Sequence, residues 1–148
     1  MIELINQFKT VYHHLNADNV DSLAEVYAAE LTFIDPFHRI DGLDAFKAYI
    51  RNLYANVSQC RFEFGEPVAQ SLLVDSPSQL RRVYLDWTMT FCHPRLNKGQ
   101  PISVPGVSQL QCDEKIIRHQ DFFDGGALLY QHIPVLGQVI KRLKRRMM

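Results

Sequence analysis

The stretch that decides the fold runs from Leu15 to Pro36 and reads LNADNVDSLAEVYAAELTFIDP. Its polar start, Asn16 to Asn19, interrupts one helical pattern and is suited to cap a second helix. The buried face of that second helix is expected to carry Leu23, Val26 and Tyr27. A β-prone run from Leu31 to Asp35 follows, and Pro36 ends it. The stretch therefore predicts a helix followed directly by a short strand.

Helical spacing extends on both sides of this stretch. Before it, apolar residues recur at helical intervals over residues 2–16, which predicts a first helix. After it, Asp41 is placed to cap a third helix, and Asp44 in the first turn suits the helix dipole. The apolar stripe of this third helix consists of Phe46, Tyr49, Ile50 and Leu53.

The second half of the chain alternates as β-strands do. The clearest strand covers residues 82–92, where one face carries Val83, Leu85, Trp87, Met89 and Phe91. Further strands are predicted over residues 61–64, 102–112 and 115–124, with Gly125-Gly126 closing the sheet. In the last strand, one face is expected to carry Ile117, His119, Asp121 and Phe123. An amphipathic helix is predicted from Leu128 to Arg146, with Pro134 starting or kinking it. Helices followed by a meander predict an α+β domain.

These pieces, in this order, resemble the SnoaL-like branch of the nuclear-transport-factor-2-like superfamily. The Leu15–Pro36 stretch resembles its opening, Gly42 and Phe46 match the start of its third helix, and IRHQDFFD (117–124) resembles its last strand. The resemblance implies an α+β fold with a cone-shaped, curved antiparallel sheet wrapped on three N-terminal helices. We therefore expect one domain, with the SnoaL-like part over residues 1–126 and a C-terminal amphipathic helix over residues 127–148.

The resemblance also implies an apolar pocket between helices and sheet that holds a small hydrophobic molecule. The residues expected to contact that molecule are Tyr12, Phe33, Trp87, Met89, Phe91 and Phe123. The alternative interpretation is that the apolar stripe of residues 83–91 is ordinary packed core, since most such stripes are.

Three residues are candidates for acid/base chemistry. Asp121 matches the acid/base aspartate of SnoaL-like cyclases, and His119, two residues earlier, points the same way and is placed to be its partner. Asp35 matches the general base of ketosteroid isomerases. Each has a structural alternative: a buried hydrogen bond for the His119–Asp121 pair, and a cap on the Pro36 turn for Asp35.

Two departures argue against ketosteroid isomerase activity itself. Val11 and Val107 occupy the positions where those enzymes place the two hydrogen-bond donors to the enolate. One function that the residues leave open is a small-molecule pocket protein that acts as a cofactor-independent acid/base enzyme of isomerase, cyclase, dehydratase or hydrolase type. No metal site or cofactor is expected. The alternative is a non-catalytic module that binds a ligand or a protein.

The charge is unevenly distributed along the 148 residues. There are 16 basic and 16 acidic residues, but five of the basic ones lie in the last turns, as Lys141, Arg142, Lys144, Arg145 and Arg146. Without a basic face through the fold, nucleic-acid binding is not expected. The basic end is either solvated or in weak contact with an anionic membrane.

The remaining expectations concern assembly and compartment. We expect a homodimer formed through the outer face of the sheet. The three widely spaced cysteines do not form a disulfide framework, which favours a cytoplasmic protein.

Overall fold

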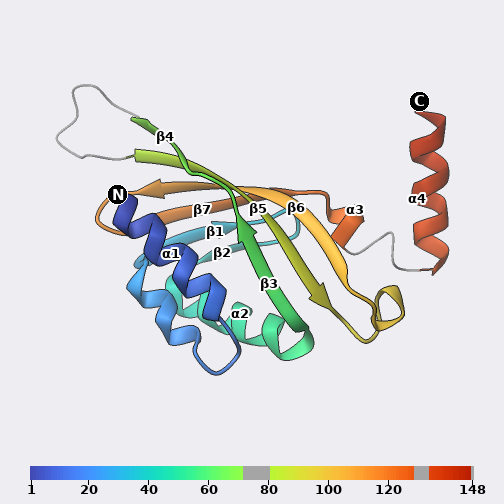
Figure 1. Cartoon of the computed structure of the whole chain (residues 1–148), viewed down its shortest axis with the longest axis horizontal. Helices are drawn as coiled ribbons and strands as arrows, with labels where there is room; N and C mark the ends of the chain where they lie inside the picture. Colours follow the sequence, from blue (N-terminus) through green and yellow to red (C-terminus); the bar gives the residue numbers. More distant parts are fainter. Residues whose placement is uncertain (72–80, 129–133, 148) are drawn as a thin grey trace.

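The computed structural model describes residues 1–71, 81–128 and 134–147, and Figure 1 shows it as a curved sheet with helices on one side. The elements of the first half are α1 (Ile2–His14), the 3₁₀ helix η1 (Val20–Glu25), β1 (Tyr27–Ile34), β2 (Arg39–Asp41) and α2 (Leu43–Asn56). Those that follow are β3 (Ser58–Phe64), β4 (Val68–Ser71), β5 (Arg81–Cys92), η2 (Asn97–Gly99), β6 (Ile102–Cys112), β7 (Ile116–Phe123), α3 (Gly125–Leu128) and α4 (Pro134–Arg146).

The strands form a single seven-stranded sheet in the order β2-β1-β7-β6-β5-β3, with β4 also paired to β5. The α+β class and the curved, open sheet wrapped on helices confirm the expected fold. One pairing departs from the antiparallel pattern, because β1 runs parallel to β7, with Phe33 opposite His119. This pairing places the end of β1 beside the residues expected to carry the chemistry.

The Leu15–Pro36 stretch differs from its prediction in the second helix, which is only the six-residue 3₁₀ helix η1. Asn16 and Asn19 bind neighbouring backbone instead of capping an α-helix: the Asn16 N–H donates to Asn19 Oδ1 at 2.7 Å. Tyr27, expected on the helix, begins β1 and pairs with Ile116. Strand pairing with β7 thus overrides the helical spacing of this short segment.

The start of α2 also corrects the sequence expectation. Gly42, with φ 94° and ψ 140°, precedes the first residue of α2, whereas Asp41 lies in β2 and binds Arg39 and Thr32. A positive φ is a conformation that glycine adopts without steric penalty. Along α2, Phe46 and Ile50 are buried as expected, but Leu53 is 39% exposed.

The apolar stripe of β5 serves two purposes. Val83 and Leu85 are fully buried in the main core, which also includes Phe8 and Tyr27. Trp87, Met89 and Phe91, further along the same face, border a cavity instead. Core and pocket wall are therefore successive parts of one strand face.

In β7, a register irregularity alters the predicted faces. The pairing shifts between Gln111 and Cys112, so that Ile116, and not Ile117, is fully buried in the core. His119 and Asp121 keep the same side, because the shift precedes them. The Gly125-Gly126 pair, expected only to close the sheet, begins the short helix α3.

The C-terminal helix α4 starts at Pro134, as the sequence predicts, while residues 129–133 of the expected helix lie outside the described residues. Figure 1 shows α4 to one side of the sheet. None of the described helices is both long and apolar enough to cross a bilayer. The domain boundaries and the homodimer stay predictions.

Candidate functional site

A cavity of about 550 Å³ lies between the helices and the sheet. Its wall takes side chains from α1, β1, α2, β3, β5, β7 and α3. Of the residues singled out from the sequence, all but one line it, namely Tyr12, Phe33, Asp35, Trp87, Met89, Phe91, Asp121 and Phe123. The parallel pairing of β1 with β7 and the stripe of β5 bring these distant residues together.

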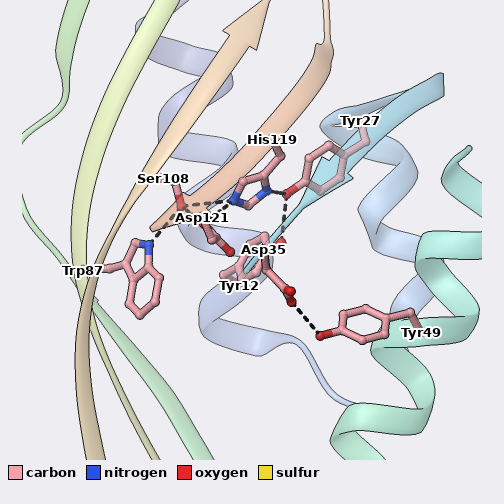
Figure 2. A network of polar contacts seen from close by, with 8 residues as sticks. All are labelled: Tyr12, Tyr27, Asp35, Tyr49, Trp87, Ser108, His119 and Asp121. Atoms are coloured by element: carbon pink, nitrogen blue, oxygen red, sulfur yellow. Dashed lines mark hydrogen bonds and ion pairs between the residues drawn. The ribbon is translucent and has the colours of Figure 1, made fainter. Parts of the chain in front are cut away.

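The exception is His119, which lies behind the cavity wall with only 2% of its surface exposed. Figure 2 shows its imidazole ring between the phenol of Tyr27 and the carboxylate of Asp121. The distances are 2.6 Å from Nδ1 to the Tyr27 hydroxyl and 2.7 Å from Nε2 to Asp121 Oδ1. Both ring nitrogens are therefore engaged, and His119 reaches the cavity only through its neighbours.

The hydrogen-bond pattern assigns a direction to this chain of contacts. An ionised Asp121 can only accept, so Nε2 of His119 donates to it, and in the neutral imidazole Nδ1 then accepts from the Tyr27 hydroxyl. Tyr27 in turn accepts from the Tyr12 hydroxyl at 2.8 Å. The chain runs Tyr12, Tyr27, His119, Asp121, and its first and last members both line the cavity.

Ser108, on β6, is a member of the network that the sequence interpretation missed. Its hydroxyl donates to Asp121 Oδ1 at 2.5 Å and accepts from Trp87 Nε1 at 2.9 Å. It is 2% exposed. The signal was present: in β6 the alternate residues Ile102, Val104 and Leu110 are buried, and Ser108 is a polar residue in that inward series.

The two carboxylate oxygens of Asp121 differ in their hydrogen bonding. Oδ1 accepts from both Ser108 and His119. Among the described residues, no hydrogen bond is made to Oδ2, and the side chain is 16% exposed on the cavity wall. A carboxylate fixed through one oxygen presents the other in a defined orientation.

Asp35 has its oxygens more fully occupied. Oδ1 accepts the backbone N–H groups of Phe37 and His38, both at 2.7 Å, which is the turn-capping role weighed from the sequence. Oδ2 accepts the Tyr49 hydroxyl at 3.1 Å, and the His38 ring lies 3.2 Å from Oδ1. Asp35 lines the cavity but has fewer free lone pairs than Asp121 for binding a proton.

Burial determines the protonation state of the tyrosines in this region. Desolvation raises the pKa of Tyr12 and of Tyr27 well above the ordinary value of a phenol; the hydrogen bond between them opposes the rise for Tyr12 and adds to it for Tyr27. Burial also raises the pKa of Tyr49, and the nearby carboxylate of Asp35 adds to that effect. All three are neutral hydroxyl groups that can donate hydrogen bonds.

The two valines at the positions where ketosteroid isomerases carry hydrogen-bond donors differ in burial. Val11 is buried in the main core, and Val107 is 37% exposed on β6. Neither lines the cavity. In the described part of the chain, no three His, Cys, Asp or Glu side chains gather as metal ligands.

The rim of the cavity is more polar than its floor. The end of α2 contributes Asn52 and Asn56, and the loop after β5 contributes His93 and Arg95. Arg95 is exposed and is the one Lys or Arg among the described residues that line the cavity. Positive charge therefore lies at the rim, and the carboxylates Asp35 and Asp121 lie elsewhere on the wall.

Comparison with solved structures places the fold among known proteins. A protein with a ketosteroid isomerase-like fold from Catenulispora acidiphila, solved with trimethylamine, is 15% identical with a TM-score of 0.68, over 88% of this chain and 92% of that one. A candidate SnoaL-like polyketide cyclase from Jannaschia sp. is 14% identical with a TM-score of 0.69, over 90% and 93%. At these identities the likeness concerns the fold.

Comparison of the sequence with protein families identifies the family itself. The search among curated proteins found no match. The family model described as "SnoaL-like domain" matches residues 8–119, which is most of the chain and includes the second half of α1 and the sheet up to His119, while the cavity residues Asp121, Phe123 and Leu128 lie beyond the match. The chain therefore belongs to the SnoaL-like domain family.

Proposed function

We propose that this protein is a cofactor-independent acid/base enzyme that moves a proton within a small, largely apolar molecule, in a reaction of isomerase or cyclase type. The observation that carries the proposal is Asp121, a carboxylate on the wall of an apolar cavity with Oδ1 held and Oδ2 available. A substrate C–H group next to a carbonyl is the bond that such a base breaks.

Asp121 Oδ2 would remove a proton from the substrate and return it at another atom. Ser108 and His119 keep hydrogen bonds to Oδ1 before and after the transfer, so the carboxylate does not need to reorient. This positioning lowers the reorganisation that the reaction requires. In this scheme His119 and Ser108 are positioning residues, since neither is on the cavity wall.

The hydroxyl chain supplies a second route for the proton. His119 can pass its Nε2 proton to the ionised Asp121 and take one from Tyr27 at Nδ1, while Tyr27 takes one from Tyr12. Asp121 gives the proton that it received to the ligand and is ionised again. Tyr12 then takes a proton from a ligand in the same cavity. A high pKa keeps both phenols protonated at rest, so the chain starts in the donating state.

The rim supports a ligand with an anionic end. A negatively charged group would be repelled by Asp35 and Asp121 but attracted by the exposed Arg95, and the amides of Asn52 and Asn56 line the same cavity. The favoured substrate is therefore a ring-sized apolar molecule with a carbonyl directed inward and an acidic group at the rim.

The test uses 2-tetralone, a two-ring ketone with acidic C–H groups, in D₂O. Proton NMR follows the exchange of these hydrogens for deuterium. We expect the protein to accelerate exchange above buffer, and Asp121→Asn to lose that acceleration by about 10²- to 10⁴-fold, the usual contribution of a general base. Asp113→Asn, in the exposed turn before β7, is the matched control and should exchange like the natural sequence.

The alternative function, ligand binding without catalysis, gives a different result in the same system. Trp87 is the single tryptophan and lies on the cavity wall, so its fluorescence reports occupation directly. Binding of 2-tetralone that changes this fluorescence, with exchange rates equal in the natural protein and Asp121→Asn, would identify a binding module and refute the enzyme.

A further inference from the structure

We propose that α4 is an interfacial helix that docks the protein on an anionic lipid surface. Its apolar side chains Leu136, Val139, Ile140 and Leu143 follow the i, i+3, i+4, i+7 spacing of one helical face. Leu136, Val139 and Leu143 are 40%, 49% and 54% exposed. An exposed apolar stripe on a regular helix indicates a surface that is covered by something else.

The charges of α4 identify what covers it. All its charged residues are cations, Lys141, Arg142, Lys144, Arg145 and Arg146, and all are exposed. None shares the stripe, because at 100° per residue they fall beside or opposite it. Basic side chains flanking an apolar stripe are the arrangement of helices that lie in the headgroup region of anionic membranes.

Among the described residues, one of these five cations forms an ion pair within the protein. Lys144 Nζ lies 3.1 Å from Asp124 Oδ2, and both side chains are about half exposed. An exposed ion pair of this kind is weak, so a lipid phosphate can take the place of Asp124. The pair fixes α4 loosely next to α3 and leaves the apolar stripe uncovered.

The helix is also tied close to the cavity. Leu128, which lines the cavity, is six peptide units from Pro134, and these units span at most about 20 Å in any conformation. Docking through α4 therefore keeps the cavity near the membrane surface, where apolar molecules concentrate. This use rests on the proposed function, but the docking itself does not.

The test is sedimentation of the full chain with two kinds of vesicle, pure phosphatidylcholine and a 70:30 mixture with phosphatidylserine. We expect binding to the anionic vesicles only, and its loss in 0.5 M NaCl. Replacing all five α4 cations by Gln should weaken binding by 100-fold or more, since each basic residue near such a surface contributes roughly fivefold. Val139→Gln with Leu143→Gln should weaken it by about tenfold or more.

Arg51→Gln with Arg61→Gln, two exposed cations of α2 and β3, is the matched control and should bind like the natural protein. Urea unfolding followed by Trp87 fluorescence verifies that each variant is folded. Equal binding to both vesicle types, or unchanged binding of the five-Gln variant, would overturn the proposal. A third result would also overturn it: the protein binds neither vesicle and is a dimer by light scattering, whereas Val139→Gln/Leu143→Gln is a monomer. The apolar stripe would then be covered by a second copy of the chain.

Discussion

At the residue scale, His119 shows how a buried polar group is kept in a core. Its ring is packed against the aromatic rings of Phe8, Phe33 and Tyr27. Both nitrogens have hydrogen-bond partners, and among the described residues no buried side-chain polar atom is left without one. The network is therefore structural and chemical at once, since the contacts that stabilise His119 also orient Asp121.

Tyr27→Phe tests the structural part of this network. The change removes the only hydroxyl that contacts His119 Nδ1 among the described residues and leaves this nitrogen unpaired in the core. We expect the free energy of unfolding to fall by about 1–3 kcal/mol, measured by urea denaturation.

The control for this prediction is Tyr84→Phe on β5. The Tyr84 hydroxyl accepts a partly buried hydrogen bond from Gln109, outside the network. The change should alter stability by less than about 0.5 kcal/mol, as most substitutions away from buried networks do. An equal loss in both variants would mean that the hydroxyl of Tyr27 has no special role.

At the element scale, the start of α2 and the packing of Trp87 in the β5–β6 pairing each depend on a glycine. Gly42 supplies the positive φ between β2 and α2. Gly106 lies opposite Trp87 in the β5–β6 pairing, and its missing side chain makes room for the indole ring. Both positions determine where neighbouring elements can lie, although neither residue makes a side-chain contact.

Gly42→Ala tests the first position. An alanine there would hold a backbone conformation that only glycine adopts readily, so we expect a loss of about 1–3 kcal/mol in the free energy of unfolding by urea. Asp41→Ala is the control, because the sequence pattern assigns the helix cap to Asp41. It should change stability little, and a larger loss for Asp41→Ala than for Gly42→Ala would restore the cap interpretation.

Gly106→Ala tests the role of the glycine in the β5–β6 pairing. A Cβ atom at this position would overlap the Trp87 ring, so the indole must move and its bond to Ser108 must break. We expect a loss of about 1–3 kcal/mol in stability, together with a shift in the Trp87 emission. Ser103→Ala, an exposed position on the same strand, should change neither. An unaltered Trp87 spectrum in Gly106→Ala would contradict this packing.

At the scale of the whole molecule, burial of weakly acidic groups makes stability sensitive to high pH. Burial raises the pKa of Cys112 to about 11 from the ordinary value of 9.0, and raises those of Tyr12 and Tyr27 further. Above pH 9 the unfolded chain releases these protons while the folded protein keeps them. Since the unfolded state then binds fewer protons, stability must fall as the pH rises.

We expect the free energy of unfolding in urea to be nearly level from pH 7 to pH 8.5 and to fall between pH 9 and pH 11. Each group that is ionised only in the unfolded chain contributes up to about 1.4 kcal/mol per pH unit. Cys112→Ala should reduce the part of the decline that begins near pH 9, to which Cys60 also contributes because burial raises the pKa of its thiol, and should leave the part due to the tyrosines above pH 10. A level profile up to pH 10.5 in the natural protein would contradict the burial of these groups.

The α+β class and the inward position of several cavity residues were predictable from local patterns. Alternation along residues 82–92 predicted β5, and the placement of Tyr12, Trp87 and Asp121 on inward faces followed from helical and strand periods. These predictions succeeded because periodicity depends only on which side of one element faces the core. The shortened second helix and the register shift at Ile117 were not predictable, since they depend on how β7 pairs with its neighbours β1 and β6.

By itself, the sequence determined the family, the general succession of helices followed by strands, and several of the polar residues placed on inward faces. Only the tertiary structure decided their roles. It places His119 behind the cavity wall and Asp121 on that wall, and it shows that Asp35 binds the backbone of a turn. It also shows that Ser108 binds Asp121 and that the stripe of β5 is partly core and partly cavity wall. The physical reason is that a hydrogen bond joins two particular atoms from distant segments. Periodicity fixes the face of a side chain, but the partner on the neighbouring strand decides whether that side chain is held, buried or free to react.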